Sequence, residues 1–78
     1  MAHIIPDPDS KWLNATPVVV RKGCFPTCIV LRPWDCPVTP FVVHRAIAIN
    51  GKWEYEQGSY CMSRTAADEA FFARSGEA

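Results

Sequence analysis

The fold of this chain is decided by residues 41–56, which read FVVHRAIAINGKWEYE. Asn50 and Gly51 form the dipeptide preferred in two-residue type I′ hairpins, so we expect the flanking segments to pair as antiparallel strands. The turn also predicts the register, with Arg45 opposite Glu56 on one face. On the other face it sets two small residues against two aromatic ones, Ala46 against Tyr55 and Ala48 against Trp53, which suits cross-strand packing.

Further strands are expected on both sides of the hairpin. Two segments rich in β-branched residues precede it, Thr16–Lys22 and Cys28–Arg32, and a turn separates them. After the hairpin, residues 57–59 indicate a kink or bulge, and Tyr60–Met62 is expected to continue the sheet. Residues 1–14 contain two prolines and are expected to form an irregular arm that docks with Ile4, Ile5, Trp12 and Leu13.

The C-terminal segment has the features of a helix. Ser63 is a suitable N-cap for residues 64–74, Arg74 lies where the helix dipole favours a cation, and Gly76 is expected at C′. The pattern predicts an α+β fold for a single domain, residues 1–78. About four antiparallel strands within residues 16–62 form a meander, and the helix of residues 63–75 packs on one face. The expected core is Val18, Val20, Ile29, Leu31, Val42, Trp53, Tyr55, Tyr60 and Phe71.

Length and charge narrow the classes of function. The chain has 78 residues, enough for one small domain, and its 49% hydrophobic content is typical of a globular protein. Eight basic residues balance eight acidic ones, which excludes an overtly basic nucleic-acid binder and an acidic nucleic-acid mimic. No secretory signal and no apolar run of about 20 residues is present, so we predict a soluble cytoplasmic protein with no membrane partner.

No catalytic motif is present, and we predict that the protein is not an enzyme. A glycine-rich phosphate loop, a serine nucleophile elbow and a zinc-protease helix are all absent from the sequence. His44 lies on the strand face of Ala46 and Tyr55, and no sequence signature places a thiol or an orienting carboxylate beside it. We interpret His44 as a partly exposed, hydrogen-bonded strand residue.

The four cysteines are open to two interpretations. Cys24 and Cys28 have the spacing of one zinc knuckle, whereas Cys36 and Cys61 do not complete a second. We expect small buried hydrophobic side chains and no cofactor. The alternative is a zinc-stabilised or redox module built on all four.

Two surface regions are candidates for binding. Arg21, Lys22 and Arg32 would cluster if the first two predicted strands pair, which leaves weak nucleic-acid binding as an alternative function. The function that we predict first is a protein-binding module, whose partner contacts the loop of residues 33–40. There Trp34 lies among prolines and is flanked by Arg32 and Asp35. Phe72 points away from the predicted apolar stripe of the helix and offers a second contact. Homodimerisation through Phe72 or through a sheet edge is a companion hypothesis.

Residues 42–74 carry a resemblance. The features are His44-Arg45-Ala46, Trp53-Glu54-Tyr55, Gly58-Ser59-Tyr60-Cys61 and an alanine-rich helix that ends Phe71-Phe72-Ala73-Arg74. The segment resembles the ends of small proteins of phages and other mobile elements. The resemblance implies an accessory or inhibitor protein that binds and modulates a host macromolecule.

Overall fold

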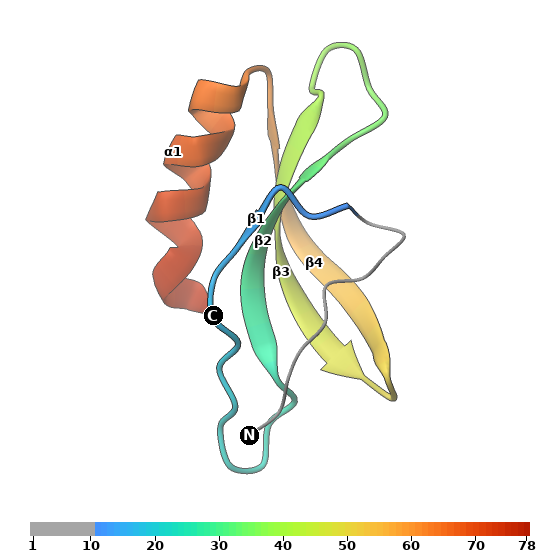
Figure 1. Cartoon of the computed structure of the whole chain (residues 1–78), viewed down its shortest axis with the longest axis vertical. Coiled ribbons are helices and arrows are strands. Elements are labelled where there is room, and N and C mark those ends of the chain that lie inside the picture. The colour runs from blue at the N-terminus through green and yellow to red at the C-terminus, as the bar shows by residue number, and fades with distance from the viewer. Residues whose placement is uncertain (1–10) are drawn as a thin grey trace.

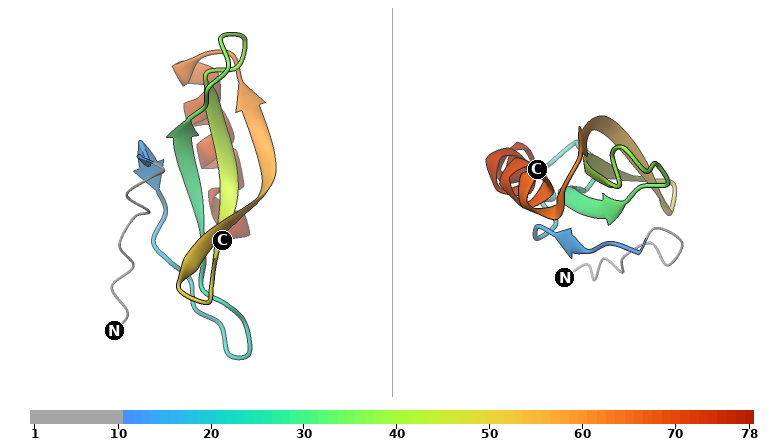
Figure 2. Two further views of the ribbon diagram at one scale, coloured as in Figure 1. Left: turned by 90° about the vertical axis from the view of Figure 1, so that its right-hand side faces the viewer. Right: turned by 90° about the horizontal axis from the view of Figure 1, so that it is seen from above.

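One antiparallel sheet and one helix make up the part of the chain that the structure describes, residues 11–78 of a computed structural model. The strands lie in the order β1-β2-β3-β4, so each strand pairs with its neighbour in sequence, and the helix covers one face (Figures 1 and 2). This arrangement confirms the predicted α+β meander with a C-terminal helix. The elements are β1 (Asn14–Ala15), β2 (Thr27–Pro33), β3 (Phe41–Ile49), β4 (Lys52–Cys61), α1 (Arg64–Arg74) and a 3₁₀ turn (Ser75–Glu77).

The central hairpin confirms the predicted turn and register. Asn50 and Gly51 have φ values of 52° and 77°, as the two central positions of a type I′ turn require. The pairs run from Ile49 opposite Lys52 to Arg45 opposite Glu56, and these last two side chains form an ion pair of 3.2 Å. Turn chemistry and side-chain pairing therefore agree in β3 and β4.

The predicted first strand, Thr16–Lys22, is wrong. Regular pairing with β2 is confined to the two residues of β1, and beyond them only Val19 forms an isolated bridge, to Thr27. The Thr16 hydroxyl accepts the hydrogen bond of the Ile29 amide, so a side chain takes the place of a backbone carbonyl. Pro17, which follows, has no amide to donate. The ladder therefore ends there, and Val20, predicted in the core, is 63% exposed.

The predicted N-terminal arm is described only from residue 11, so Ile4 and Ile5 lie outside the described residues. Trp12 docks on the sheet as expected, because its ring lies against that of Trp53 with 5.2 Å between the centroids. Leu13 remains exposed, but its amide donates to the Leu31 carbonyl at 2.8 Å.

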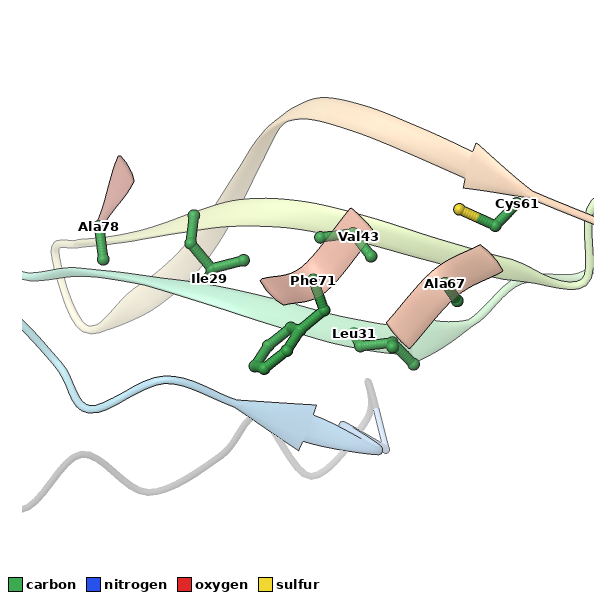
Figure 3. Packing of buried hydrophobic residues seen from close by; sticks show 7 residues of the cluster. All are labelled: Ile29, Leu31, Val43, Cys61, Ala67, Phe71 and Ala78. Carbon is green, nitrogen blue, oxygen red and sulfur yellow. The ribbon is translucent and has the colours of Figure 1, made fainter. Parts of the chain in front are cut away.

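Each face of the sheet carries its own apolar cluster. Under the helix, side chains from β2, β3 and β4 meet α1 and the last residue: Ile29, Leu31, Val43, Cys61, Ala67, Phe71 and Ala78 (Figure 3). On the opposite face, Cys28, Val30 and Ala46 are covered by Trp12, Val18, Trp53 and Tyr55. The inner strands are thus buried on both sides, which explains why Val30 and Val43 are core residues that alternation alone did not predict.

The helix begins and ends where the sequence predicts. The Ser63 hydroxyl accepts from the Ala66 amide at 3.1 Å, as an N-cap does. At the other end, residues 75–77 tighten into the 3₁₀ turn, so Gly76 does not serve as a left-handed C′ residue. Within residues 11–78 no helix is long and apolar enough to cross a membrane.

Candidate functional site

On the sheet face opposite the helix, one cationic side chain lies among four aromatic rings. Because side chains alternate along a strand, Ile29 and Leu31 point to the helix while Arg32 points away from it. Around Arg32 lie rings from β3, β4 and the loop after β2. We call this group, Arg32, Trp34, His44, Tyr55 and Tyr60, the aromatic face.

The guanidinium of Arg32 lies between two rings. Its Cζ atom is 4.1 Å from the ring centroid of Tyr55 and 5.4 Å from that of Trp34, within the range of cation–π attraction. Its Nη2 atom lies 3.4 Å from Nε2 of His44, and its buried Nε atom has no hydrogen-bond partner. Arg32 forms no ion pair with any carboxylate of residues 11–78.

Trp34 is held in place and still open to solvent. Its amide donates to the Pro40 carbonyl at 2.8 Å, which closes the base of the proline-rich loop. Its ring meets that of Tyr60 edge-on, with 5.4 Å between centroids. Trp34 is nevertheless 39% exposed and Tyr60 51% exposed, so these two rings form the open end of the aromatic face.

His44 lies beneath the open end and is only 6% exposed, so the expectation of a partly exposed histidine is wrong. Burial, the Arg32 guanidinium and, more weakly, Arg74 lower the pKa of His44, although the nearby Glu56 carbonyl opposes them. The neutral imidazole can accept from Arg32 through Nε2, whereas an imidazolium would place two cations side by side. His44 therefore serves as a neutral support for Arg32.

A β-bulge decides which rings share this face. Between Val43 and Arg45 the register shifts by one, so that His44 lies opposite two residues of β4, Gln57 and Gly58. Gln57 adopts a φ of 50°, and the extra residue reverses the alternation of everything that follows. Tyr60 consequently joins Tyr55 on the aromatic face. Tyr60 lies at the uncovered end of this face and is 51% exposed, so its prediction as a core residue is wrong.

Arg74, from the end of α1, fastens the bulge from the other side of the sheet. Its Nη1 atom donates to the Val43 carbonyl at 2.9 Å, to the Ser59 hydroxyl at 3.0 Å and to the Gln57 carbonyl. Its Nε atom pairs with Glu77 at 3.2 Å. Through Arg74, the helix thus donates hydrogen bonds to backbone carbonyls at the point where the bulge interrupts the strand ladder.

The far end of this sheet face is closed. The Trp12 indole nitrogen donates to the Tyr55 hydroxyl at 2.9 Å, and Trp12 also packs on Trp53. These contacts cover the part of this face that lies towards the Asn50–Gly51 turn. A partner of the aromatic face would therefore approach it at Trp34 and Tyr60.

Of the residues predicted for protein binding, two meet and two do not. Arg32 and Trp34 lie together as expected. Asp35 is exposed in the loop and forms no ion pair within residues 11–78. Phe72 is 73% exposed on α1, whose helix covers the opposite face, so Phe72 belongs to a separate surface.

The three basic residues predicted to cluster are kept apart. Arg21 donates through Nη2 to the Ala78 backbone oxygen at 2.8 Å, beside the apolar cluster under the helix. Lys22 is exposed in the same connection, whereas Arg32 lies on the aromatic face. The antiparallel register explains the separation, because Val19 pairs with Thr27 and Asn14 with Leu31, so Arg32 lies at the end of β2 away from the connection that carries Arg21 and Lys22.

The cysteines form no disulfide and no common site. Cys28 and Cys61 are buried in the clusters on opposite faces, and burial raises the pKa of the Cys28 thiol to about 11 and also raises that of Cys61. Cys24 is exposed, and hydrogen bonds with Thr39 lower the pKa of the half-buried Cys36. No group of three or more potential metal ligands occurs among the described residues. The interpretation as buried hydrophobic side chains is thus confirmed for Cys28 and Cys61 and wrong for Cys24.

The sequence contains one local signal for the composition of the aromatic face. The kink or bulge predicted at residues 57–59 is confirmed, and the extra residue there moves Tyr60 to the face of Tyr55. The stacking of Arg32 on Tyr55 had no local signal, because the two residues are brought together only through β3.

Comparisons of the chain with protein families, with curated proteins and with solved structures give no match.

Proposed function

We propose that this protein is a small, non-enzymatic protein-binding module whose contact surface is the open end of the aromatic face. The observation that carries the proposal is the state of Trp34, which is fixed by its neighbours and still 39% exposed. Trp, Tyr and Arg are the residue types most enriched in interface hot spots, and here Trp34, Tyr60 and Arg32 are adjacent.

Rigid presentation supports the same role. Pro33 and Pro40 bracket the loop, and the Trp34 amide is bonded to the Pro40 carbonyl. A side chain that is already ordered loses little conformational entropy when a partner covers it, so more of the contact energy remains for affinity. Trp34 is therefore a suitable anchor for a partner protein.

The resemblance of residues 42–74 to proteins of mobile elements supports an accessory or inhibitor role. The chemistry of His44 favours binding over catalysis, because this imidazole is buried and faces a cation rather than a carboxylate or a thiol. Within this proposal, the partner is a host protein.

Trp34→Ala, with Phe72→Ala as its matched control, tests the proposal. Both changes remove an exposed aromatic ring, but only the first lies on the aromatic face. A tagged protein would be used to capture partners from host lysate, and the affinity would then be measured with the purified partner. We expect Trp34→Ala to weaken binding at least about tenfold, a loss of about 1.4 kcal/mol, with little change in melting temperature. Equal binding by Trp34→Ala and the unaltered protein would refute the proposal.

Self-association through Phe72 is a separate proposal. Phe72 is an exposed ring whose only ring contact within the described residues is with Phe71, at 6.1 Å between centroids. The outer edge of β4 is the less suitable surface, because the bulge at Gln57 and Gly58 interrupts it. Light scattering on a size-exclusion column should show a dimer at high concentration that Phe72→Ser removes. A monomer at every concentration would exclude self-association.

A further inference from the structure

Arg32 is a half-buried cation that meets no anion among residues 11–78. Residues 11–78 provide its guanidinium with two aromatic rings and one weak contact to a neutral imidazole, but no carboxylate. Its buried Nε atom has no hydrogen-bond acceptor. Glu56, next to Tyr55 in β4, is paired with Arg45 at 3.2 Å. Within the described part of the chain, the positive charge of Arg32 is thus not compensated by a carboxylate.

The surroundings of Arg32 strengthen its attraction for an anion. Tyr55 and Trp34 exclude water from two sides of the guanidinium, and a charge-assisted hydrogen bond becomes stronger where water is excluded. His44 at 3.4 Å helps to fix the orientation of the guanidinium. Beside the guanidinium, the exposed rings of Trp34 and Tyr60 provide apolar surface for the parts of a ligand that flank its anionic group.

We propose that the open end of the aromatic face recognises an acidic side chain of the partner protein. Its carboxylate accepts hydrogen bonds from the Arg32 guanidinium, and the residues next to it pack on Trp34 and Tyr60. This inference rests on the proposed protein-binding function and adds the chemical class of the partner segment, a peptide with an aspartate or glutamate at its centre.

The charge distribution favours a single carboxylate over a nucleic acid. A polyanion is bound by several cations along its backbone, but Arg21 and Lys22 lie away from the aromatic face. The chain as a whole has no net charge, so no wider positive field adds to Arg32. One cation between two rings matches one acidic side chain.

The test is a selection of binders from a library of random, capped nine-residue peptides, performed with the full chain. We expect the selected peptides to share an Asp or Glu beside an aromatic or aliphatic residue. Replacing that acidic residue by Gln or Asn in the synthetic peptide should weaken its binding by about tenfold to a hundredfold, as loss of a charged hydrogen bond predicts. This comparison leaves the protein unaltered, so its folding is not in question.

Variants of the protein provide the second arm. Arg32→Gln should bind the acidic peptide and its Gln counterpart equally, whereas the unaltered protein should prefer the acidic one. Selected peptides that need Trp34 but show no acidic preference would overturn this inference and leave the proposed function standing. Peptide binding that Trp34→Ala does not weaken would overturn both.

A single-stranded oligothymidylate serves as the competing probe. The probe could bind more tightly than the selected peptides, with an affinity that falls steeply with salt. That result would show that the ligand is a nucleic acid and would overturn the inference. No binding of the oligonucleotide, together with the acidic preference, would support it.

Discussion

The imidazole of His44 fills the space beside Gly58 in which any other residue would place its Cβ atom. A Cβ at position 58 would lie 2.8 Å from Cε1 of His44 and 3.1 Å from Cε2 of Tyr60. The β-bulge therefore packs as one unit with the buried His44 and the exposed ring of Tyr60. Because His44 also contacts Arg32, a disturbance at Gly58 would reach the candidate binding site.

Gly58→Ala should destabilise the protein by about 1–3 kcal/mol, since overpacking moves side chains off their preferred positions. Gly76→Ala is the matched control, because no atom lies within 4 Å of a Cβ built there. It should change stability by no more than about 0.5 kcal/mol. Urea unfolding measures both. The loss in the double variant His44→Ala/Gly58→Ala should be smaller than the sum of the two single losses, and equal effects at positions 58 and 76 would contradict the packing described.

Arg74→Met should destabilise the protein by about 2 kcal/mol or more. The change keeps the length of the side chain but leaves the Val43 and Gln57 carbonyls without their donor. Arg64→Met is the control, because the ion pair of Arg64 with Asp68 is exposed and contributes little. The free energies of unfolding in urea should differ clearly between the two variants. Equal stabilities would show that the Arg74 hydrogen bonds do not hold the bulge.

Stability should fall as the pH is lowered from 7 towards 5. The pKa of His44 in the folded protein lies below its ordinary value of 6.5, so the unfolded chain takes up a proton first. The folded state is therefore favoured fully above pH 6.5, and it loses stability below that pH until folded His44 also binds a proton. Melting temperatures at pH 7 and pH 5 test this. In His44→Gln the decrease should be smaller, and an identical decrease would assign it to other groups.

The thiols should react in two classes. Cys24 is exposed and Cys36 has a lowered pKa, so both should react quickly with a thiol reagent in the native protein. Cys28 and Cys61 are buried with raised pKa values and should react only as the protein unfolds. Four thiols in denaturant and no zinc by metal analysis are expected. A count of two would indicate a disulfide, and bound zinc would support the alternative of a metal module.

Features that depend on neighbouring residues were predictable from the sequence. Asn50 and Gly51 accept positive φ angles, and that preference alone determines the turn and the first five pairs of the hairpin. Ser63 caps the next helical amides through its own hydroxyl, so the start of α1 is also local. The α+β meander follows, because strands joined by short connections pair with their neighbours.

Features that depend on contacts between distant segments were decided by the tertiary structure. Thr16–Lys22 has the residues of a strand, but its regular pairing with β2 ends at Thr16 and Pro17, and beyond them only Val19 bonds to β2, in an isolated bridge to Thr27. Tyr60 changes face because one extra residue enters β4, and the position of that residue depends on His44 and Arg74 from other elements. The aromatic face has the same origin. No spacing in the sequence predicts the contact of Arg32 with Tyr55, because β3 separates the two strands and side-chain alternation determines which residues meet across it.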